Sequence, residues 1–233
     1  MYFPFYCIFN LEGFCLDIDR IFLDGNNEIE AKKMSAYMRD QFKFLGIKSP
    51  VRKKLQKEIF KKIIKPKEID RDFVVEFFEK EYREFQYMVI DYLVKQKNFL
   101  VEEDIFLIRN LITNKSWWDT VDIISSNLLG HICKKYPNIV NEHILSWIND
   151  ENMWIRRSSI IFQLRYKEDT NLEVLSKAIK DNLSDDDFFI KKAIGWALRE
   201  YSKTNSNWVK NFIFENKLSS LSVKEAEKYI KKR

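Results

Sequence analysis

Two tryptophans and two aspartates lie close together in the segment SWWDTVD, residues 116–122. Residues four apart share one face of a helix, so Trp118 and Asp122 are expected side by side, with Ser125 on the same face. A different stripe of the same helix is apolar and is expected to face the core; it is made of Trp117, Val121, Ile124 and Leu128. An indole beside a carboxylate, away from the core stripe, is more than packing requires and marks a candidate chemical site.

A second candidate lies in WIRRSSIIFQL, residues 154–164, where a guanidinium interrupts an apolar line. Arg157 shares a helix face with Trp154, Ile161 and Leu164, whereas Arg156 points elsewhere. One interpretation is an ion pair with a carboxylate, which would be purely structural. The other is a site for phosphate, because the planar guanidinium donates two parallel hydrogen bonds to phosphate oxygens. The spacing leaves both open.

A third candidate is Trp196, in the segment 187–203. The core stripe of that segment is Ile190, Ile194, Ala197 and Tyr201. Trp196 lies off this stripe, with Lys192, Arg199 and Glu200 around it. An aromatic ring among bases suits stacking or sugar contact in nucleic-acid binding. Packing against a neighbouring helix is the alternative.

These three candidates are related by an internal repeat. Residues 154–164 resemble residues 189–198 with an offset of 35, which places Arg157 on Lys192. The same offset in the other direction places Arg157 on Asp122. A period of this length is typical of stacked helix pairs, in which equivalent positions line up along one surface. We therefore expect Asp122, Arg157 and Lys192 to form a row, chance similarity of two amphipathic helices being the alternative.

The elements that position these residues are predicted to be helices. Only 5 Gly and 4 Pro occur in 233 residues, too few for the turns of an all-β fold. Ser116 and Asp119 fit a capping pattern, which predicts that Ser116 begins the central helix. Apolar residues recur every three or four positions. The expected helices are 14–24, 28–44, 50–64, 70–80, 83–96, 101–113, 116–134, 138–149, 152–166, 170–182, 187–203, 206–215 and 222–231.

Composition and charge limit the classes of function that the sequence can have. Three cysteines and two histidines at wide spacings give no metal pattern, so neither a metal nor another cofactor is expected. No segment reaches 18 apolar residues, and we expect a cytoplasmic protein without a membrane partner. Residues 1–30 carry a net charge of −5 and the remainder +10, which suits a polyanionic partner. Residues 1–12 are predicted to be an extension of unknown role, and residues 13–233 a single domain.

Four segments together resemble the AlkD family of DNA alkylation repair proteins. They are AYMRDQFKFLGIKSPVRK (36–53), SWWDTVD (116–122), WIRRSSIIFQL (154–164) and FFIKKAIGWALREYSKTN (188–205). They occur in the same order and spacing, from about residue 20 to the C-terminus. The resemblance implies an all-α fold, an α-solenoid of HEAT-like helix pairs, C-shaped with a basic concave face around duplex DNA.

The resemblance also implies an activity and its residues. The family's active-site cleft of two tryptophans, an aspartate and an arginine falls on Trp118, Trp196, Asp122 and Arg157. This implies a monofunctional alkylpurine DNA glycosylase that removes N3- and N7-alkylated purines such as 3-methyladenine and 7-methylguanine. We expect a monomer that acts on double-stranded DNA. A DNA-structure-binding protein without catalysis, or a protein-interaction scaffold, is the alternative.

Further contacts with DNA are expected from basic and aromatic residues outside this cleft. Tyr37 matches a DNA-contacting position of the family, while Lys48 occupies a position where the family has glutamine. A lysine at that position can still contact a phosphate. The remaining expected contacts with the DNA backbone are Lys192, Arg156 and Arg199, whose affinity would fall with salt.

Overall fold

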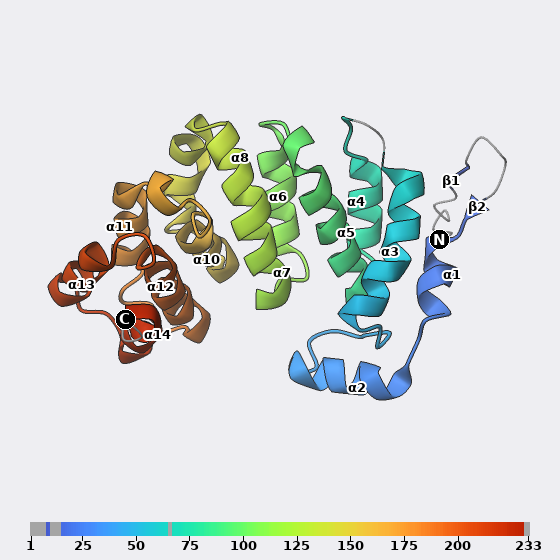
Figure 1. The fold of residues 1–233 in the computed structure, drawn as a ribbon, viewed down its shortest axis with the longest axis horizontal. Helices are drawn as coiled ribbons and strands as arrows, with labels where there is room; N and C mark the ends of the chain where they lie inside the picture. The colour runs from blue at the N-terminus through green and yellow to red at the C-terminus, as the bar shows by residue number, and fades with distance from the viewer. Residues whose placement is uncertain (1–7, 10–14, 65–66, 231–233) are drawn as a thin grey trace. The chain divides into compact units, whose positions relative to one another are not determined.

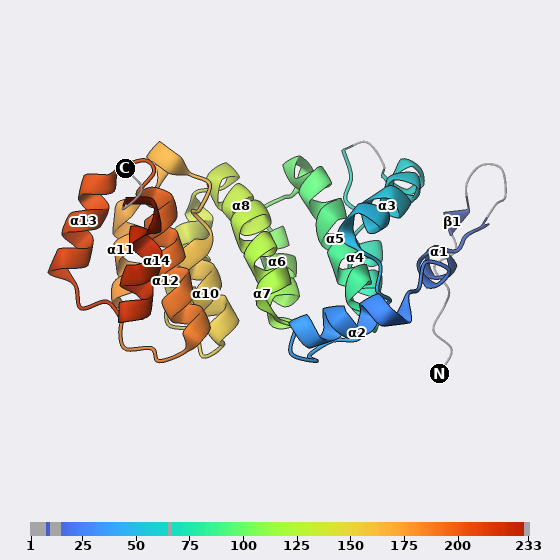
Figure 2. The same cartoon turned by 60° about the horizontal axis from the view of Figure 1, so that its bottom comes forward.

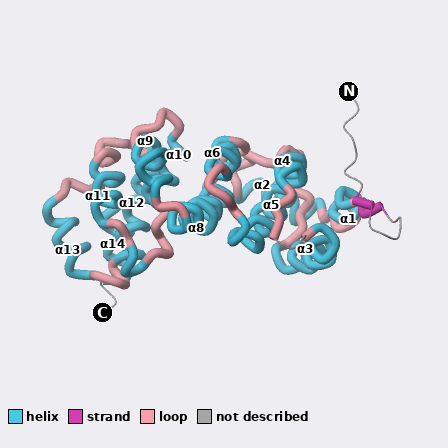
Figure 3. Tube along the Cα trace, turned by 90° about the horizontal axis from the view of Figure 1, so that it is seen from above, coloured by secondary structure: helices cyan, strands magenta, loops and turns pink. Residues whose placement is uncertain are grey.

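The computed structural model describes residues 8–9, 15–64 and 67–230. Within these ranges the chain is built from helices joined by short connections, apart from one antiparallel pair of two-residue strands, β1 (Ile8–Phe9) and β2 (Cys15–Leu16) (Figures 1 and 3). The predicted all-α fold of stacked helix pairs is confirmed. Apart from Ile8–Phe9, the extension predicted over residues 1–12 lies outside the described residues.

The helices group into two compact units, residues 1–99 and 100–233. The single domain predicted over residues 13–233 stays a prediction. The first unit contains α1 (Ile18–Leu23), α2 (Glu28–Tyr37), α3 (Ser49–Ile63), α4 (Arg71–Phe78), α5 (Arg83–Gln96) and the 3₁₀ turn η1 (Lys97–Phe99). Helix α5 packs on both α3 and α4. Their shared core is aromatic, with ring centroids 5.0 Å apart for Phe22 and Phe85 and 4.8 Å apart for Phe73 and Phe77.

Helix α2 is shorter than the predicted helix over residues 28–44, which was wrong at its C-terminal end. The chain leaves the helix after Tyr37 because Arg39 and Asp40 adopt left-handed backbone conformations, with φ of 56° and 55°. No residue of α2 is buried, so little apolar contact extends this helix. Figure 2 shows α2 running across the ends of the neighbouring helices of its unit.

A buried carboxylate fixes the segment between α2 and α3. The two oxygens of Glu84 accept hydrogen bonds from the backbone N–H groups of Leu45, Gly46 and Ile47, at 3.0, 2.9 and 3.1 Å. Gly46 has a φ of +83°, and a Cβ there would lie 2.1 Å from the carbonyl oxygen of Asn27. Only glycine fits this position, so the segment takes one defined path into α3.

The second unit contains the rest of the helices. They are α6 (Asp104–Thr113), α7 (Trp118–Ile123), the π-helical turn η2 (Ile124–Leu129), α8 (Gly130–Lys135), the π-helical turn η3 (Val140–Ile144), α9 (Leu145–Trp147), α10 (Met153–Ile161), the 3₁₀ turn η4 (Lys167–Asp169), α11 (Leu172–Lys180), α12 (Phe188–Tyr201), α13 (Ser206–Glu215) and α14 (Ser220–Ile230). Helix α10 contacts α6, α9, α11 and α12, and α12 packs closely on α14 (Figures 1 and 2).

Short polar side chains begin four consecutive helices of this unit. Asn152, Asn171, Asp187 and Asn205 accept hydrogen bonds from backbone N–H groups in the first turns of α10, α11, α12 and α13. Such caps satisfy N–H groups that have no partner within the helix. Below them lies one apolar core that includes Ile161, Ile190 and Leu198. The stack places the side chains of successive helices in register.

Within the described residues, no helix combines the length and the apolar character needed to cross a bilayer.

Candidate functional site

The start of the central helix differs from the prediction. Helix α7 begins at Trp118, and Trp117 precedes it in an extended conformation without a side-chain cap. The hydroxyl of Ser116 instead donates to the carbonyl oxygen of Ile112 at 2.6 Å, in the preceding helix α6. The prediction that Ser116 caps the helix was therefore wrong, because α6 uses that hydroxyl for its own last carbonyl groups.

The core face of this helix is confirmed. Val121, Ile124 and Leu128 are fully buried. The Trp117 ring lies against Trp154 and Phe189, with centroids 5.8 and 5.2 Å away. These three rings connect the beginnings of α7, α10 and α12, and so hold the three helices that carry the candidate residues.

Ser125 was predicted beside Asp122 on the outer face, and this was wrong. Its hydroxyl is buried and lies at hydrogen-bond distance from the carbonyl oxygen of Val121, 2.7 Å, and from the hydroxyl of Ser158, 2.8 Å. The π-helical turn η2 begins at Ile124 and shifts the register of the side chains that follow. Ser126 takes the place beside Asp122 instead, donating to the Asp122 carbonyl oxygen at 2.8 Å.

The central feature of the site is an ion pair between α7 and α10. Arg157 donates from Nε to Oδ1 of Asp122 at 2.8 Å and from Nη2 to Oδ2 at 2.9 Å. The side chains are 5% and 14% exposed for Arg157 and Asp122. A third hydrogen bond joins Nη1 of Arg157 to the carbonyl oxygen of Phe189 at the start of α12. Of the two interpretations of Arg157, the structure has the pair with a carboxylate, formed with the residue 35 positions earlier.

Burial and the charge of Arg157 shift the pKa of the Asp122 carboxyl group in opposite directions. Burial raises the pKa of Asp122 above its ordinary value, while the hydrogen bonds and the charge of Arg157 lower it and the charge of Asp119 raises it further. Arg157 is therefore the group that favours the ionised form in a site largely closed to water. A carboxylate in such a place interacts strongly with a nearby positive charge.

Lys192 is the third residue of the predicted row. Burial lowers the pKa of Lys192, and the neighbouring charges of Lys228, Arg199 and Arg157 lower it too. The contact between Asp122 and Arg157 follows the offset of 35, whereas the side chain of Lys192 on α12 is bound to Glu225.

The two tryptophans lie on either side of this row in the chain, and both are half-buried. Trp118 is the first residue of α7, one helical turn before Asp122. Trp196 is on α12, where part of its ring packs against the apolar core of the unit. The rest of it lines an open groove together with Ser126.

Lys192 and Arg199, predicted to contact DNA, share an acidic partner that the sequence interpretation missed. Glu225 of α14 is 5% exposed and accepts hydrogen bonds from Lys192, Arg199 and Lys228. A Cβ at Gly195 would lie 2.5 Å from the Cβ of Glu225, so a glycine lets α14 approach this closely. The spacing of Ser222, Glu225 and Ala226 on one face of α14 was the available signal for a buried glutamate.

Arg156, also predicted to contact DNA, has acceptors within the protein. Its guanidinium donates to the carbonyl oxygens of Asp150 and Glu151 and to the carboxylate of Asp185 at 2.8 Å. It therefore joins the turn before α10 to the turn before α12. The DNA contact of Arg156 stays a prediction.

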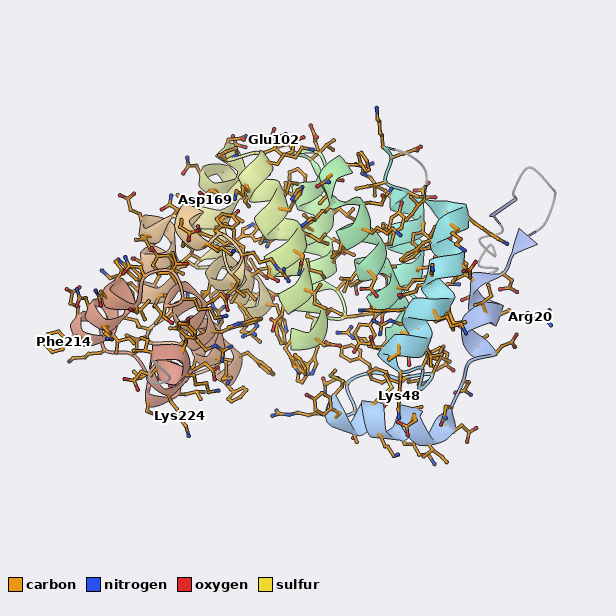
Figure 4. All side chains as sticks on the ribbon, viewed as in Figure 1. Arg20, Lys48, Glu102, Asp169, Phe214 and Lys224 are labelled. Carbon is orange, nitrogen blue, oxygen red and sulfur yellow. The ribbon has the colours of Figure 1, made fainter. Side chains whose placement is uncertain are left out.

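Tyr37 and Lys48 belong to the first unit. Tyr37 ends α2 and is 71% exposed. Lys48 precedes α3 and pairs with Glu30 at 2.9 Å, with its own side chain largely exposed (Figure 4). Both side chains are accessible to a partner, and their DNA contacts stay predictions.

Among the described residues, no group of three His, Cys, Asp or Glu side chains is arranged to hold a metal ion. The chemistry available to the candidate site comes from one carboxylate, one guanidinium and two indole rings.

The helix pairs are stacked in the order of the sequence, and an ion pair joins equivalent positions of neighbouring repeats. These features define a helical-repeat protein, and its candidate site lies on the second unit. The chain belongs to the family described as DNA alkylation repair enzyme, which matches residues 20–230. Membership implies an enzyme of DNA alkylation repair, with DNA as its substrate.

Solved structures agree with this assignment. A predicted DNA alkylation repair enzyme from Enterococcus faecalis is 35% identical, with a TM-score of 0.82 over 89% of this chain and 98% of that one. The crystal structure of smu.31 from Streptococcus mutans UA159 shares the fold, at 17% identity and a TM-score of 0.55, over 91% of this chain and 96% of that one. No curated protein matches the chain.

Proposed function

We propose that this protein is a DNA glycosylase that hydrolyses the N-glycosidic bond of N3- and N7-alkylated purines, such as 3-methyladenine and 7-methylguanine, in duplex DNA. The observation that carries the proposal is the Asp122 carboxylate, which Arg157 grips through both oxygens at 2.8 and 2.9 Å. Trp118 and Trp196 provide aromatic surface on the same unit. Membership in a DNA alkylation repair family supplies the substrate class.

The chemistry fits the residues that are present. Alkylation at N3 or N7 makes the purine cationic and therefore a good leaving group, so no strong general acid is required. As the bond to the base breaks, positive charge develops on the deoxyribose, as in other glycoside hydrolyses. Asp122 stabilises that charge and holds the attacking water. The base leaves as a neutral purine with the electron pair of the broken bond, the water oxygen bonds to C1′, and the proton that the water loses passes through the Asp122 carboxylate to solvent, without a covalent intermediate.

The other three residues bind and orient. The faces of Trp118 and Trp196 are electron-rich and attract a developing cation on the sugar. Arg157 fixes the plane of the Asp122 carboxylate through two hydrogen bonds. Its guanidinium has N–H donors beyond its three contacts in the protein, and these can meet a backbone phosphate.

The test is release of 7-methylguanine from methylated duplex DNA, compared between the wild type and Asp122→Asn. We expect Asp122→Asn to bind the DNA but to release the base about 10²–10³-fold more slowly, the usual effect of losing one electrostatic stabiliser. Asp169→Asn is the matched control, because Asp169 is an exposed partner of Lys134 on the same unit and should leave the rate unchanged (Figure 4). A folded, DNA-bound wild type that releases no alkylated purine would overturn the proposal in favour of a binding protein.

A further inference from the structure

A groove of about 440 Å³ opens beside the candidate site, and apart from Trp196 its lining residues have no part in the chemistry proposed so far. It is lined by Ser126, Leu164, Arg165, Lys167, Trp196 and Glu200. These residues come from the π-helical turn η2, from the segment after α10 and from α12, all within the second unit. The groove has an apolar side at Leu164 and Trp196 and a cationic side at Arg165 and Lys167.

The two cations of the groove are available to a ligand. Among the described residues, neither the Arg165 nor the Lys167 side chain forms a hydrogen bond or an ion pair, and both are exposed. Most other bases near the candidate site are occupied, since Arg157 is held by Asp122 and Lys192 by Glu225. The free positive charge next to the site is therefore concentrated at the groove.

The backbone has an unusual conformation at Lys167. Lys167 has a φ of 53°, in the left-handed region that side chains other than glycine seldom adopt. This turn sends Lys167 back toward Trp196 on α12, to the same groove that Arg165 lines two residues earlier. Strained residues of this kind are concentrated at binding sites, where the surrounding structure fixes them.

The groove is close enough to Asp122 to take the neighbouring part of the same DNA strand. Ser126 lies one helical turn after Asp122, and its hydroxyl donates to the Asp122 carbonyl oxygen at 2.8 Å. Ser126 also lines the groove, so the groove begins about one helical turn, about 5.4 Å along the helix axis, from Asp122. A strand with its sugar at Asp122 therefore has a phosphate within one or two nucleotides that can reach the groove.

The acidic residue of the groove, Glu200, does not cancel the positive charge of Arg165 and Lys167. Glu200 lines the groove, but its carboxylate accepts a hydrogen bond from Lys203 at 2.6 Å. The lining carries Arg165 and Lys167 against this one paired acid, so its net charge is positive. A phosphodiester, singly charged and rich in acceptor oxygens, matches this lining better than an uncharged ligand.

We infer that this groove binds one phosphodiester of the damaged strand, one or two nucleotides from the reacting sugar, through Arg165 and Lys167. The inference rests on the proposed function for the position of the reacting sugar, but it concerns binding and not hydrolysis.

The experiment removes the charge of one phosphate at a time. Duplexes that carry a stable abasic-site analogue are made with a single neutral methylphosphonate at each of the three linkages on either side. The dissociation constant of each is measured for the wild type and for Arg165→Gln/Lys167→Gln. Lys210→Gln on α13 is the control for loss of a basic charge away from the groove, because Lys210 is exposed and does not line it.

The expected result is a coupling at one linkage or at two adjacent ones. There, the methylphosphonate weakens wild-type binding about three- to ten-fold and leaves the binding of the double variant unchanged. The double variant should also reduce the slope of log Kd against log salt by about one for each phosphate that it no longer neutralises, whereas Lys210→Gln keeps the wild-type coupling.

Equal losses for the wild type and the double variant at every linkage would overturn the inference. The assay needs no turnover, so a protein that shows the coupling yet releases no purine would contradict only the proposed function. Failure of both would appear as no coupling and no release.

Discussion

The contact between Asp122 and Arg157 should couple these two residues in the stability of the second unit, and a double-mutant cycle measures that coupling. The variants are Asp122→Asn, Arg157→Gln and the two combined. The pair has two hydrogen bonds, at 2.8 and 2.9 Å, between side chains that are 14% and 5% exposed. At this burial, little of the interaction is screened by water.

The size of the effect follows from what each single variant leaves behind. Removing one partner of a buried ion pair costs about 3–5 kcal/mol, because the other charge stays buried without compensation. We expect Arg157→Gln at the lower end of that range, since burial raises the pKa of Asp122 and lets it escape by taking up a proton. The double variant leaves no unpaired charge, so its loss should be smaller than the sum by about 1.5–3 kcal/mol.

Urea unfolding followed by circular dichroism is the assay, with the slope against urea checked for each variant. The control cycle is Lys134→Gln with Asp169→Asn, which has the same offset of 35 and a distance of 2.6 Å, but side chains 56% and 65% exposed. That coupling should be about 0.2–1 kcal/mol. If the losses at Asp122 and Arg157 add to within about 0.5 kcal/mol, the pair does not stabilise the unit and the reasoning is refuted.

Two more predictions follow from the same neighbourhood. In the proposed reaction the carboxylate form of Asp122 is the active one. Because burial raises its pKa, base release should fall as the pH decreases through that raised value. Arg157→Gln should move this acid limb to higher pH, since it removes the charge that lowers the pKa. A pH profile of single-turnover rates checks both directions, and an unshifted limb would contradict them. Gly195→Ala should destabilise the protein by about 1–3 kcal/mol, because its Cβ would meet the Cβ of Glu225 at 2.5 Å and the backbone oxygen of Ser222 at 2.7 Å; thermal unfolding measures this, and an unchanged Tm would show that α14 can move away.

Periodic apolar residues were sufficient to predict most helices. The predicted helices 83–96 and 206–215 coincide with α5 and α13, whose apolar faces are buried in their own units. The helix predicted over 28–44 was wrong at its C-terminal end because Arg39 and Asp40 adopt left-handed conformations and no residue of α2 is buried. The chain beyond is fixed by Glu84, about forty residues later, whose carboxylate accepts hydrogen bonds from the backbone N–H groups of Leu45, Gly46 and Ile47. The residues of the helix itself show no pattern from which a contact so distant in the sequence could be predicted.

The offset of 35 was the most informative signal for the site. It works because stacked repeats place equivalent residues next to each other, which brought Asp122 to Arg157. Ser125 was misplaced because a π-helical turn breaks the period of 3.6 residues on which the assignment of helix faces depends. Arg165 and Lys167 of the groove had no signal in the sequence, since only the left-handed conformation of Lys167 turns that segment toward Trp196.

A guanidinium beside a carboxylate that is meant to stabilise a cation looks counterproductive, because it cancels part of the carboxylate's charge. The burial of Asp122 resolves this. Without Arg157, burial would favour the protonated acid, and a neutral acid gives a developing oxocarbenium ion little stabilisation. Arg157 uses one acceptor position on each oxygen, and a carboxylate has about four such positions, so others stay open for the water and the sugar. In the proposed reaction Arg157 therefore acts by keeping Asp122 ionised, and raising the pH should restore part of the activity that Arg157→Gln loses.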